Sequence, residues 1–228
     1  MVESLVVPAD LAFSDAERAA VYRVIAARRD VRRGFVNHPL PDELLRRLLA
    51  AAHSAPSVGL MQPSRFIVIR DRAIRKAVHS IFEGANAQAA ATYEGEQREQ
   101  YAALKLEGIL EAPQNLCILS DMQNERGHKL GRHTIPETAA YSTVCAVQNL
   151  WLAARAEGVG VGWVSILDPV RLRTLLHIPD HVLPVAYLCL GYVDRFATDP
   201  ELELYGWEKR VPLETAVCYD LYSEASAS

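Results

Sequence analysis

A run of arginines around one acid is the segment most able to do chemistry. Arg28, Arg29, Asp30 and Arg32 follow directly after a stretch with helical periodicity. A phosphate monoester carries about −1.5 to −2 charges, and guanidinium groups bind it through paired, charge-assisted hydrogen bonds. The segment therefore favours a small phosphate-bearing ligand. A solvated basic helix end, which would suit the helix dipole, is the plainer alternative.

A second candidate segment is the turn-rich loop of residues 55–63. Pro56, Gly59 and Pro63 break any regular structure there, and most of the other residues are small. Such a loop can bring backbone amides close to a flat polar heterocycle, and the amide of Gln62 can both donate and accept a hydrogen bond. A simple connection between two elements is the alternative.

A third candidate is the glycine-rich segment of residues 158–165. Gly158, Gly160 and Gly162 would let the backbone approach a ligand closely, or would let a helix pack tightly on a strand. A dinucleotide fingerprint has a strand before its glycines and a helix after them, whereas the order here is helix, glycines, strand. The sequence therefore disfavours a dinucleotide-binding fold of that type.

Other chemistries have little support. The seven histidines are scattered, and only His128 and His133 lie near each other, so no metal site is predicted. There is no G-x-S-x-G motif of the hydrolase type. The four cysteines lack C-x-x-C spacing, and we expect them to act as small buried apolar residues in a reducing compartment. They are Cys117, Cys145, Cys189 and Cys218.

Composition points to a globular protein with local basic character. The 228 residues are 50% hydrophobic and carry a formal net charge of −4, which does not favour nucleic acid as a partner. Residues 1–13 include Glu3 and Asp10, so they do not resemble a leader, and no apolar stretch approaches the roughly 20 residues that a membrane span needs. We expect a cytoplasmic protein.

Hydrophobic periodicity predicts one α+β domain over residues 1–228, with the arginine turn and the 55–63 loop on connections and the glycine-rich segment at the start of a strand. The helix predicted at 137–157 is apolar or neutral over most of its surface, so we expect it to be central and buried. The polar tail from residue 197 lacks a core of its own and is expected to wrap a partner subunit. Helices are predicted at 14–27, from 41, and at 71–91, 137–157 and 168–176; strands are predicted at 66–69, 115–119, 159–167 and 184–192.

Taken in order, the three candidate segments resemble the nitroreductase-like flavoprotein family over residues 16–212. The resemblance implies a mostly antiparallel sheet flanked by helices around a long buried helix. It also implies a homodimer with two FMN sites, each built across the interface, with the 55–63 loop coming from the other subunit. The implied FMN-binding residues are Arg28, Arg29, Asp30, Val31, Arg32, Pro56, Ser57, Val58, Gly59, Met61, Gln62, Gly162, Trp163, Ser165 and Arg210.

Departures from the general family pattern indicate one branch of it. Asp30 stands where serine is usual, Leu60 where asparagine is common and Ser64 where tryptophan is common. Residues 131–134, 141–145 and 163–165 add to the similarity with that branch. Its members use reduced FMN as a substrate and break it apart with dioxygen, giving dimethylbenzimidazole, the lower ligand of cobalamin, and erythrose 4-phosphate.

The branch resemblance implies that Asp30 and Ser165 are catalytic. We expect the neighbouring arginines to keep Asp30 ionised by lowering its pKa, so that it can act as a general base. Residues 84–106 are expected to close over the site as a lid. The reduced flavin is expected to come from a separate reductase. Two alternatives stay open: an NAD(P)H-dependent nitro- or quinone reductase of the same fold, and a flavin-binding protein without catalytic activity.

Overall fold

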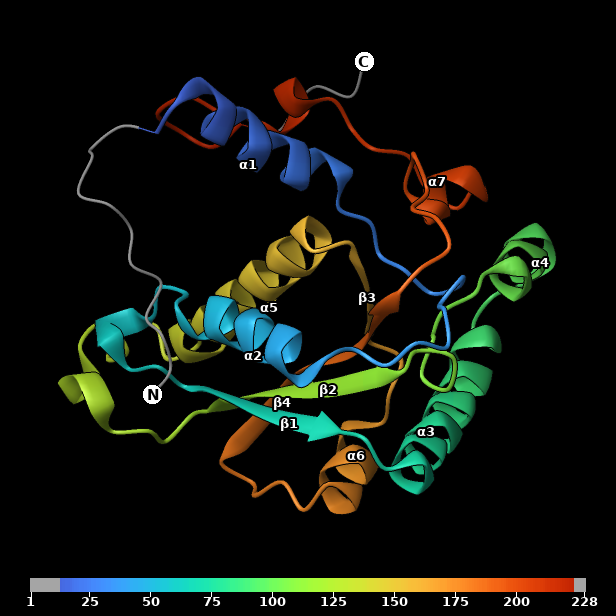
Figure 1. The fold of residues 1–228 in the computed structure, drawn as a ribbon, viewed down its shortest axis with the longest axis horizontal. Helices are drawn as coiled ribbons and strands as arrows, with labels where there is room; N and C mark the ends of the chain where they lie inside the picture. Colours follow the sequence, from blue (N-terminus) through green and yellow to red (C-terminus); the bar gives the residue numbers. More distant parts are fainter. Residues whose placement is uncertain (1–12, 224–228) are drawn as a thin grey trace.

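The computed structural model describes residues 13–223 and has an α+β architecture. A four-stranded sheet lies at the centre, with α2 (Asp42–His53) and α5 (Thr138–Ala156) on one face and α3 (Arg72–Ala90) and α6 (Pro169–Leu175) on the other (Figure 1). The prediction about a leader concerns residues that lie, except for Phe13, outside the described part of the chain. No helix among the described residues is long and apolar enough to cross a membrane.

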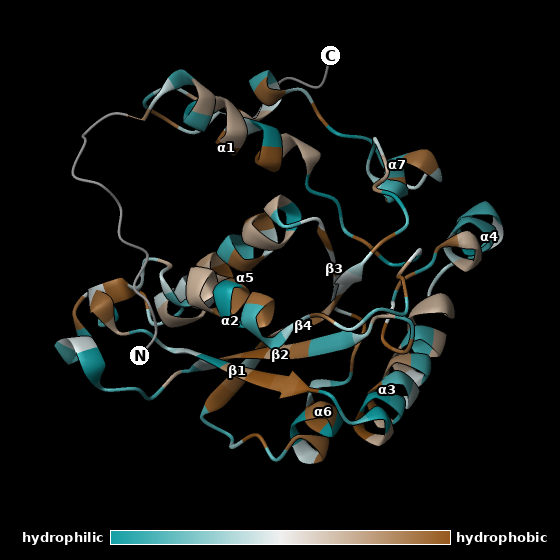
Figure 2. Cartoon of the chain, in the orientation of Figure 1, coloured by the Kyte–Doolittle hydropathy of each residue, from teal (hydrophilic) through white to brown (hydrophobic). Residues whose placement is uncertain are grey.

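The sheet is antiparallel throughout, as expected. Its strands are β1 (Ser64–Ile69), β2 (Gln114–Asp121), β3 (Val159–Val164) and β4 (Val182–Tyr192), in the order β1-β2-β4-β3. Apolar residues make up much of β1, β2 and β4 (Figure 2), and β2 is buried along nearly its whole length. All four predicted strands are confirmed, although β3 ends three residues before the predicted boundary at residue 167.

Helix α5 is central and carries one core layer, but only one of its faces is buried in the described chain. Its inner face packs on α2 and the sheet through residues such as Val147 and Leu150. Its outer face is open in the described chain, since Tyr141 is 57% exposed and Val144 is 43% exposed. The sequence could not separate the two faces because neutral and apolar residues occupy both.

The second core layer lies under α3 and α6. Both helices begin as predicted at an aspartate, because Asp71 and Asp168 accept hydrogen bonds from backbone amides of the first turn. Cys117 and Cys189 lie in this layer, and burial raises the pKa of the Cys117 thiol to about 12. Cys145 and Cys218 are exposed, so the expectation of four buried cysteines is wrong for these two.

Three helices lie at the periphery. Helix α1 (Asp15–Ala27), predicted at 14–27, begins with a capping box of Ser14 and Glu17 but buries none of its side chains in the described chain. Helix α4 (Gly95–Ala103) falls in the segment 84–106 that is expected to form a lid, and α7 (Glu201–Leu204) lies in the tail. Single 3-10 turns occur at η1 (Val58–Leu60), η2 (Arg126–Lys129) and η3 (Leu213–Ala216).

Candidate functional site

The arginine turn after α1 is fixed between β3 and the end of α5. The Val31 amide donates to the Val161 carbonyl at 3.0 Å, and Asp30 forms an isolated parallel bridge with Val161. From α5, the Trp151 indole donates to the carbonyl of Arg29 at 3.2 Å. The arginine turn is therefore not a solvated helix end: these contacts hold it in one extended conformation beside the sheet.

The glycines of β3 are needed because this turn approaches so closely. A Cβ added at Gly162 would lie 2.1 Å from the Val31 carbonyl oxygen. One at Gly160 would lie 2.7 Å from Val193, just after β4, and 3.2 Å from the methyl groups of Val31. Tight packing was one of the two interpretations of the glycine segment. The tightly packed neighbour is the arginine turn rather than the helix before β3.

Asp30 is held at both carboxylate oxygens. Its Oδ1 accepts the Trp163 amide at 2.9 Å, and its Oδ2 pairs with Arg32 Nη2 at 2.5 Å. Burial raises the pKa of Asp30, and this effect outweighs the lowering by Arg32, by the Trp163 amide and by Arg28. The arginines lower this pKa as expected, but the expected net lowering is wrong, because the sequence shows the charges and not the desolvation of the carboxylate.

The turn opens onto a cleft of about 110 Å³ in which positive groups outnumber negative ones. Arg28 stacks over the Trp151 ring with its guanidinium carbon 4.8 Å from the centroid. The Nε of Arg32 is buried and has no hydrogen-bond partner among the described residues. Such a cleft fits an anion with several acceptor oxygens. It is lined by Arg28, Arg29, Asp30, Arg32, Pro200, Glu201, Leu202 and Arg210.

The far wall of the cleft comes from the tail, which also contributes Arg210, one of the residues expected at the site. Arg29 donates to the Thr198 carbonyl, and Arg33 pairs with Glu201 at 2.5 Å and lies over the Tyr205 ring at 5.1 Å. Arg29 also donates to two carbonyls at the end of α1, so its guanidinium anchors backbone on both sides of the cleft. Sequence reasoning missed the contacts of Arg33 with Glu201 and Tyr205, because no spacing connects segments so far apart.

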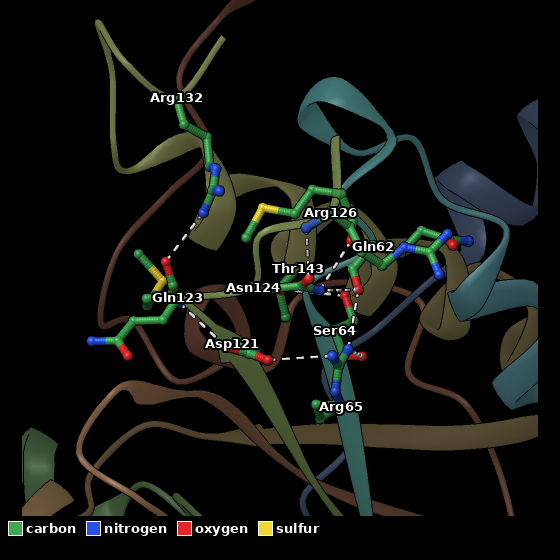
Figure 3. Close-up of polar contacts among 11 residues, drawn as sticks. Gln62, Ser64, Arg65, Asp121, Gln123, Asn124, Arg126, Arg132 and Thr143 are labelled. Carbon is green, nitrogen blue, oxygen red and sulfur yellow. Dashed lines mark hydrogen bonds and ion pairs between the residues drawn. The ribbon is translucent and has the colours of Figure 1, made fainter. Parts of the chain in front are cut away.

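The 55–63 loop is a strained, closely supported structure (Figure 3). Leu60 and Gln62 adopt positive φ values of 52° and 50°, which cost energy in residues other than glycine. The Ser57 hydroxyl accepts the Gln62 amide at 3.0 Å, and Asn124 Nδ2 donates to the Met61 carbonyl at 3.1 Å. Contacts from both sides therefore hold the strained conformation.

Two of the supports come from residues that the sequence did not single out. Arg65 donates to the Gln62 carbonyl at 3.1 Å and pairs with Asp121 (Figure 3). Gly59 and Gly127 touch through their backbones, since a Cβ on Gly127 would lie 2.1 Å from the Gly59 carbonyl oxygen. A positive φ next to a long-range backbone contact leaves no signal in a single sequence.

The structure does not bring this loop into the arginine cleft of the same chain. The Val58 amide bonds to Ser142 near the start of α5, whereas the arginine turn is held at Trp151 and beyond. Ser142 and Trp151 are nine residues apart, which corresponds to about 14 Å along the helix. The cleft is therefore not lined by the loop of its own chain, and the expectation that the loop contacts the flavin of the other subunit stays a prediction for Pro56, Ser57, Val58, Gly59, Met61 and Gln62.

The remaining predicted residues lie at or beside the cleft. Val31 is buried beneath the turn, and Gly162 and Trp163 form the stretch of β3 that faces Asp30. Ser165 is exposed and lies just beyond the end of β3, two residues after the amide that binds Asp30. Its catalytic role stays a prediction.

Residues 25–192 match the nitroreductase family. The chain is 48% identical to a 5,6-dimethylbenzimidazole synthase of Rhodospirillum rubrum, over 81% of this chain and 87% of that protein. A second 5,6-dimethylbenzimidazole synthase, from Rhodobacter capsulatus, is 42% identical over 89% of this chain and 97% of its own length.

A similar fold occurs in iodotyrosine deiodinase bound to FMN and 3-iodo-L-tyrosine. That structure gives a TM-score of 0.70 at 22% identity and covers 89% of this chain and 100% of its own. The NADPH:FMN oxidoreductase of Vibrio harveyi gives 0.65 at 20% identity, over 90% of this chain and 79% of its own. The family match and the relatives agree with the antiparallel architecture, and the chain belongs to the nitroreductase family.

Proposed function

We infer that this protein is a 5,6-dimethylbenzimidazole synthase. Its substrate is reduced FMN, which it fragments with dioxygen to 5,6-dimethylbenzimidazole and erythrose 4-phosphate. The identity of 42–48% to synthases over most of both chains supports this function. Among the site features, the observation that carries it is Asp30, a carboxylate whose side chain is only 29% exposed and which lies within a cleft of arginines. A site built only to hold a phosphate would not need that carboxylate.

The arginine cleft is the proposed seat of the flavin phosphate. Arg28, Arg32 and Arg210 line it from the turn and from the tail, and Arg32 has a buried Nε with no partner among the described residues. A phosphate oxygen would satisfy that donor and balance the excess positive charge. Arg29, which already bonds to carbonyls, is proposed to shape the cleft and to add to its positive field.

Asp30 is the proposed general base. Reduced FMN supplies the electrons for dioxygen and the ring that is broken, and this chain moves the protons. A raised pKa makes a carboxylate a stronger base, closer to the working pH, than an exposed aspartate would be. The Trp163 amide fixes the orientation of the Asp30 carboxylate by donating a hydrogen bond to one of its oxygens. Ser165, the first residue after β3, is proposed as a second catalytic group that donates a hydrogen bond through its hydroxyl.

The site is proposed to be completed by a second copy of the chain. The outer face of α5 exposes Tyr141 and Val144, and α1 exposes Val21, Tyr22 and Ile25, so an apolar surface is open for burial. The 55–63 loop lies at the other end of α5 from the cleft of its own chain. In a homodimer, the loop of one copy could reach the flavin held by the other, as the family resemblance implies.

One experiment separates this function from its alternatives. The protein is mixed with reduced FMN in air, with nicotinamide nucleotides absent, and the products are identified by mass spectrometry. We expect 5,6-dimethylbenzimidazole in proportion to the flavin consumed. Return of intact oxidised FMN with only peroxide would show a flavin-binding protein or a reductase. Supplying the electrons with a separate flavin reductase should sustain repeated turnovers.

A further inference from the structure

Helix α4 has a single firm attachment to the rest of the described chain. Tyr101 is the one residue of this helix that is buried, and it is only 6% exposed. Its hydroxyl donates to Asn86 of α3 at 2.7 Å. Its ring stacks on Tyr93, with centroids 4.8 Å apart. The other side chains of α4 face solvent or are partly exposed, so the position of the helix depends on what covers Tyr101.

Part of that cover is Trp207, which comes from the tail. The indole meets Tyr93 edge-on at 5.4 Å and Tyr101 at 6.0 Å. Both contacts have the edge-to-face geometry that aromatic pairs prefer. Segments more than 100 residues apart thus join at one aromatic cluster, and α4 and α7 lie on the same side of the molecule (Figure 1).

The same tail segment forms the wall of the arginine cleft. Glu201 and Arg210 line the cleft on either side of Trp207 in sequence, and the Trp207 amide donates to the Leu202 carbonyl at 2.9 Å. Residues 201–210 therefore contact the proposed phosphate site with one side and α4 with the other. A change in the position of this wall must move the cover of Tyr101.

We propose that Trp207 is a positioning residue that couples the arginine cleft to α4. This inference rests on the proposed function, because it takes the anion in the cleft to be the flavin phosphate. A phosphate bound by Arg210 would fix the position of residues 201–210, and these residues fix Trp207. Trp207 in turn fixes α4 through its contacts with Tyr93 and Tyr101. Enclosure of the reaction would then depend on the end of the substrate that takes no part in the chemistry.

The test is hydrogen exchange of the α4 amides, measured by mass spectrometry with and without saturating oxidised FMN. FMN should slow exchange in the wild type. In Trp207→Leu the α4 amides should exchange about ten-fold faster than in the wild type with FMN bound, since two aromatic contacts are lost. Trp207→Phe keeps an edge-on ring and should restore most of the protection.

Two further variants separate coupling from general loosening. Tyr205→Leu removes a ring of the same tail that faces Arg33, so flavin-free exchange in α4 should match the wild type. Arg210→Ala, saturated with FMN, should lose the protection that FMN adds. Equal protection of α4 in wild type and Trp207→Leu, or an unchanged FMN effect in Arg210→Ala, would overturn the coupling. A wild type that forms no 5,6-dimethylbenzimidazole would instead refute the proposed function.

Discussion

The substitution Asp30→Asn tests the proposed base with almost no change of shape. Asparagine keeps an oxygen for the Trp163 amide but removes the negative charge that meets Arg32 at 2.5 Å. Loss of a general base lowers a rate by roughly 10²–10⁴-fold, or about 2.7–5.4 kcal/mol of activation free energy. Product formation should fall by that factor. FMN affinity should hold or improve, because the cleft gains positive charge.

The pH dependence gives this prediction a second readout. Burial raises the pKa of Asp30, so the wild-type rate should rise with pH through a value above the ordinary 3.8. Asp30→Asn should lose that acidic limb. The stability of the wild type relative to Asp30→Asn should also depend on pH. Because the pKa of Asp30 is raised in the folded state, Asp30 favours folding below its unfolded-state pKa, and this contribution is lost as the pH rises through the folded-state pKa.

The assay measures 5,6-dimethylbenzimidazole by mass spectrometry and FMN affinity by flavin fluorescence across the pH range. Asp168→Asn is the matched control, because the same substitution is made at a helix cap on α6 where asparagine also caps well. It should leave rate and pH profile unchanged. An Asp30→Asn enzyme with a wild-type rate, or one whose lost rate is explained by lost FMN binding, would refute the reasoning.

Three further predictions concern the parts that build the site. Arg28→Ala should weaken FMN binding by roughly 10- to 150-fold, the value of one charge-assisted bond, whereas Arg29→Ala should mainly lower thermal stability; titration and melting curves distinguish the two. Asn124→Asp replaces a donor with a carboxylate facing a carbonyl, so unfolding free energy should fall by about 1–3 kcal/mol and FMN affinity with it. Gly162→Ala should destabilise the fold and abolish product, because its Cβ would meet backbone, while Gly84→Ala in α3 should be neutral or slightly stabilising.

Each of these has a clear contrary outcome. Equal loss of FMN affinity in Arg28→Ala and Arg29→Ala would contradict the assignment of phosphate binding to Arg28 and of a structural role to Arg29. Asn124→Asp with normal flavin affinity in spite of lower stability would separate the 55–63 loop from the flavin. A stable, active Gly162→Ala protein would show that the arginine turn does not need its close approach to β3.

The sequence was most informative where local rules decide the structure. The caps at Ser14, Asp71 and Asp168 and the short apolar runs of the strands depend on neighbours in the chain, and these elements were predicted to within a few residues. The arginine turn was identified because its chemistry is concentrated in five consecutive residues. The resemblance to a known family then connected it with Arg210.

What the sequence could not supply depends on depth and on distant contacts. The pKa of Asp30 was predicted in the wrong direction because burial, which dominates it, is a property of the folded chain. The open face of α5 looks apolar whether a partner covers it or the protein's own core does. The supports of Gln62 and the meeting of Trp207 with α4 join segments that no periodicity relates.

The most direct test of the central claim follows the carbon atoms of the substrate. The protein is incubated in air with reduced FMN that carries ¹³C throughout its ribityl chain, and the product is analysed by mass spectrometry. If the protein fragments the flavin, 5,6-dimethylbenzimidazole should appear with a single ¹³C atom, and the other labelled carbons should appear in erythrose 4-phosphate. Full recovery of labelled FMN, with no benzimidazole, would contradict the account.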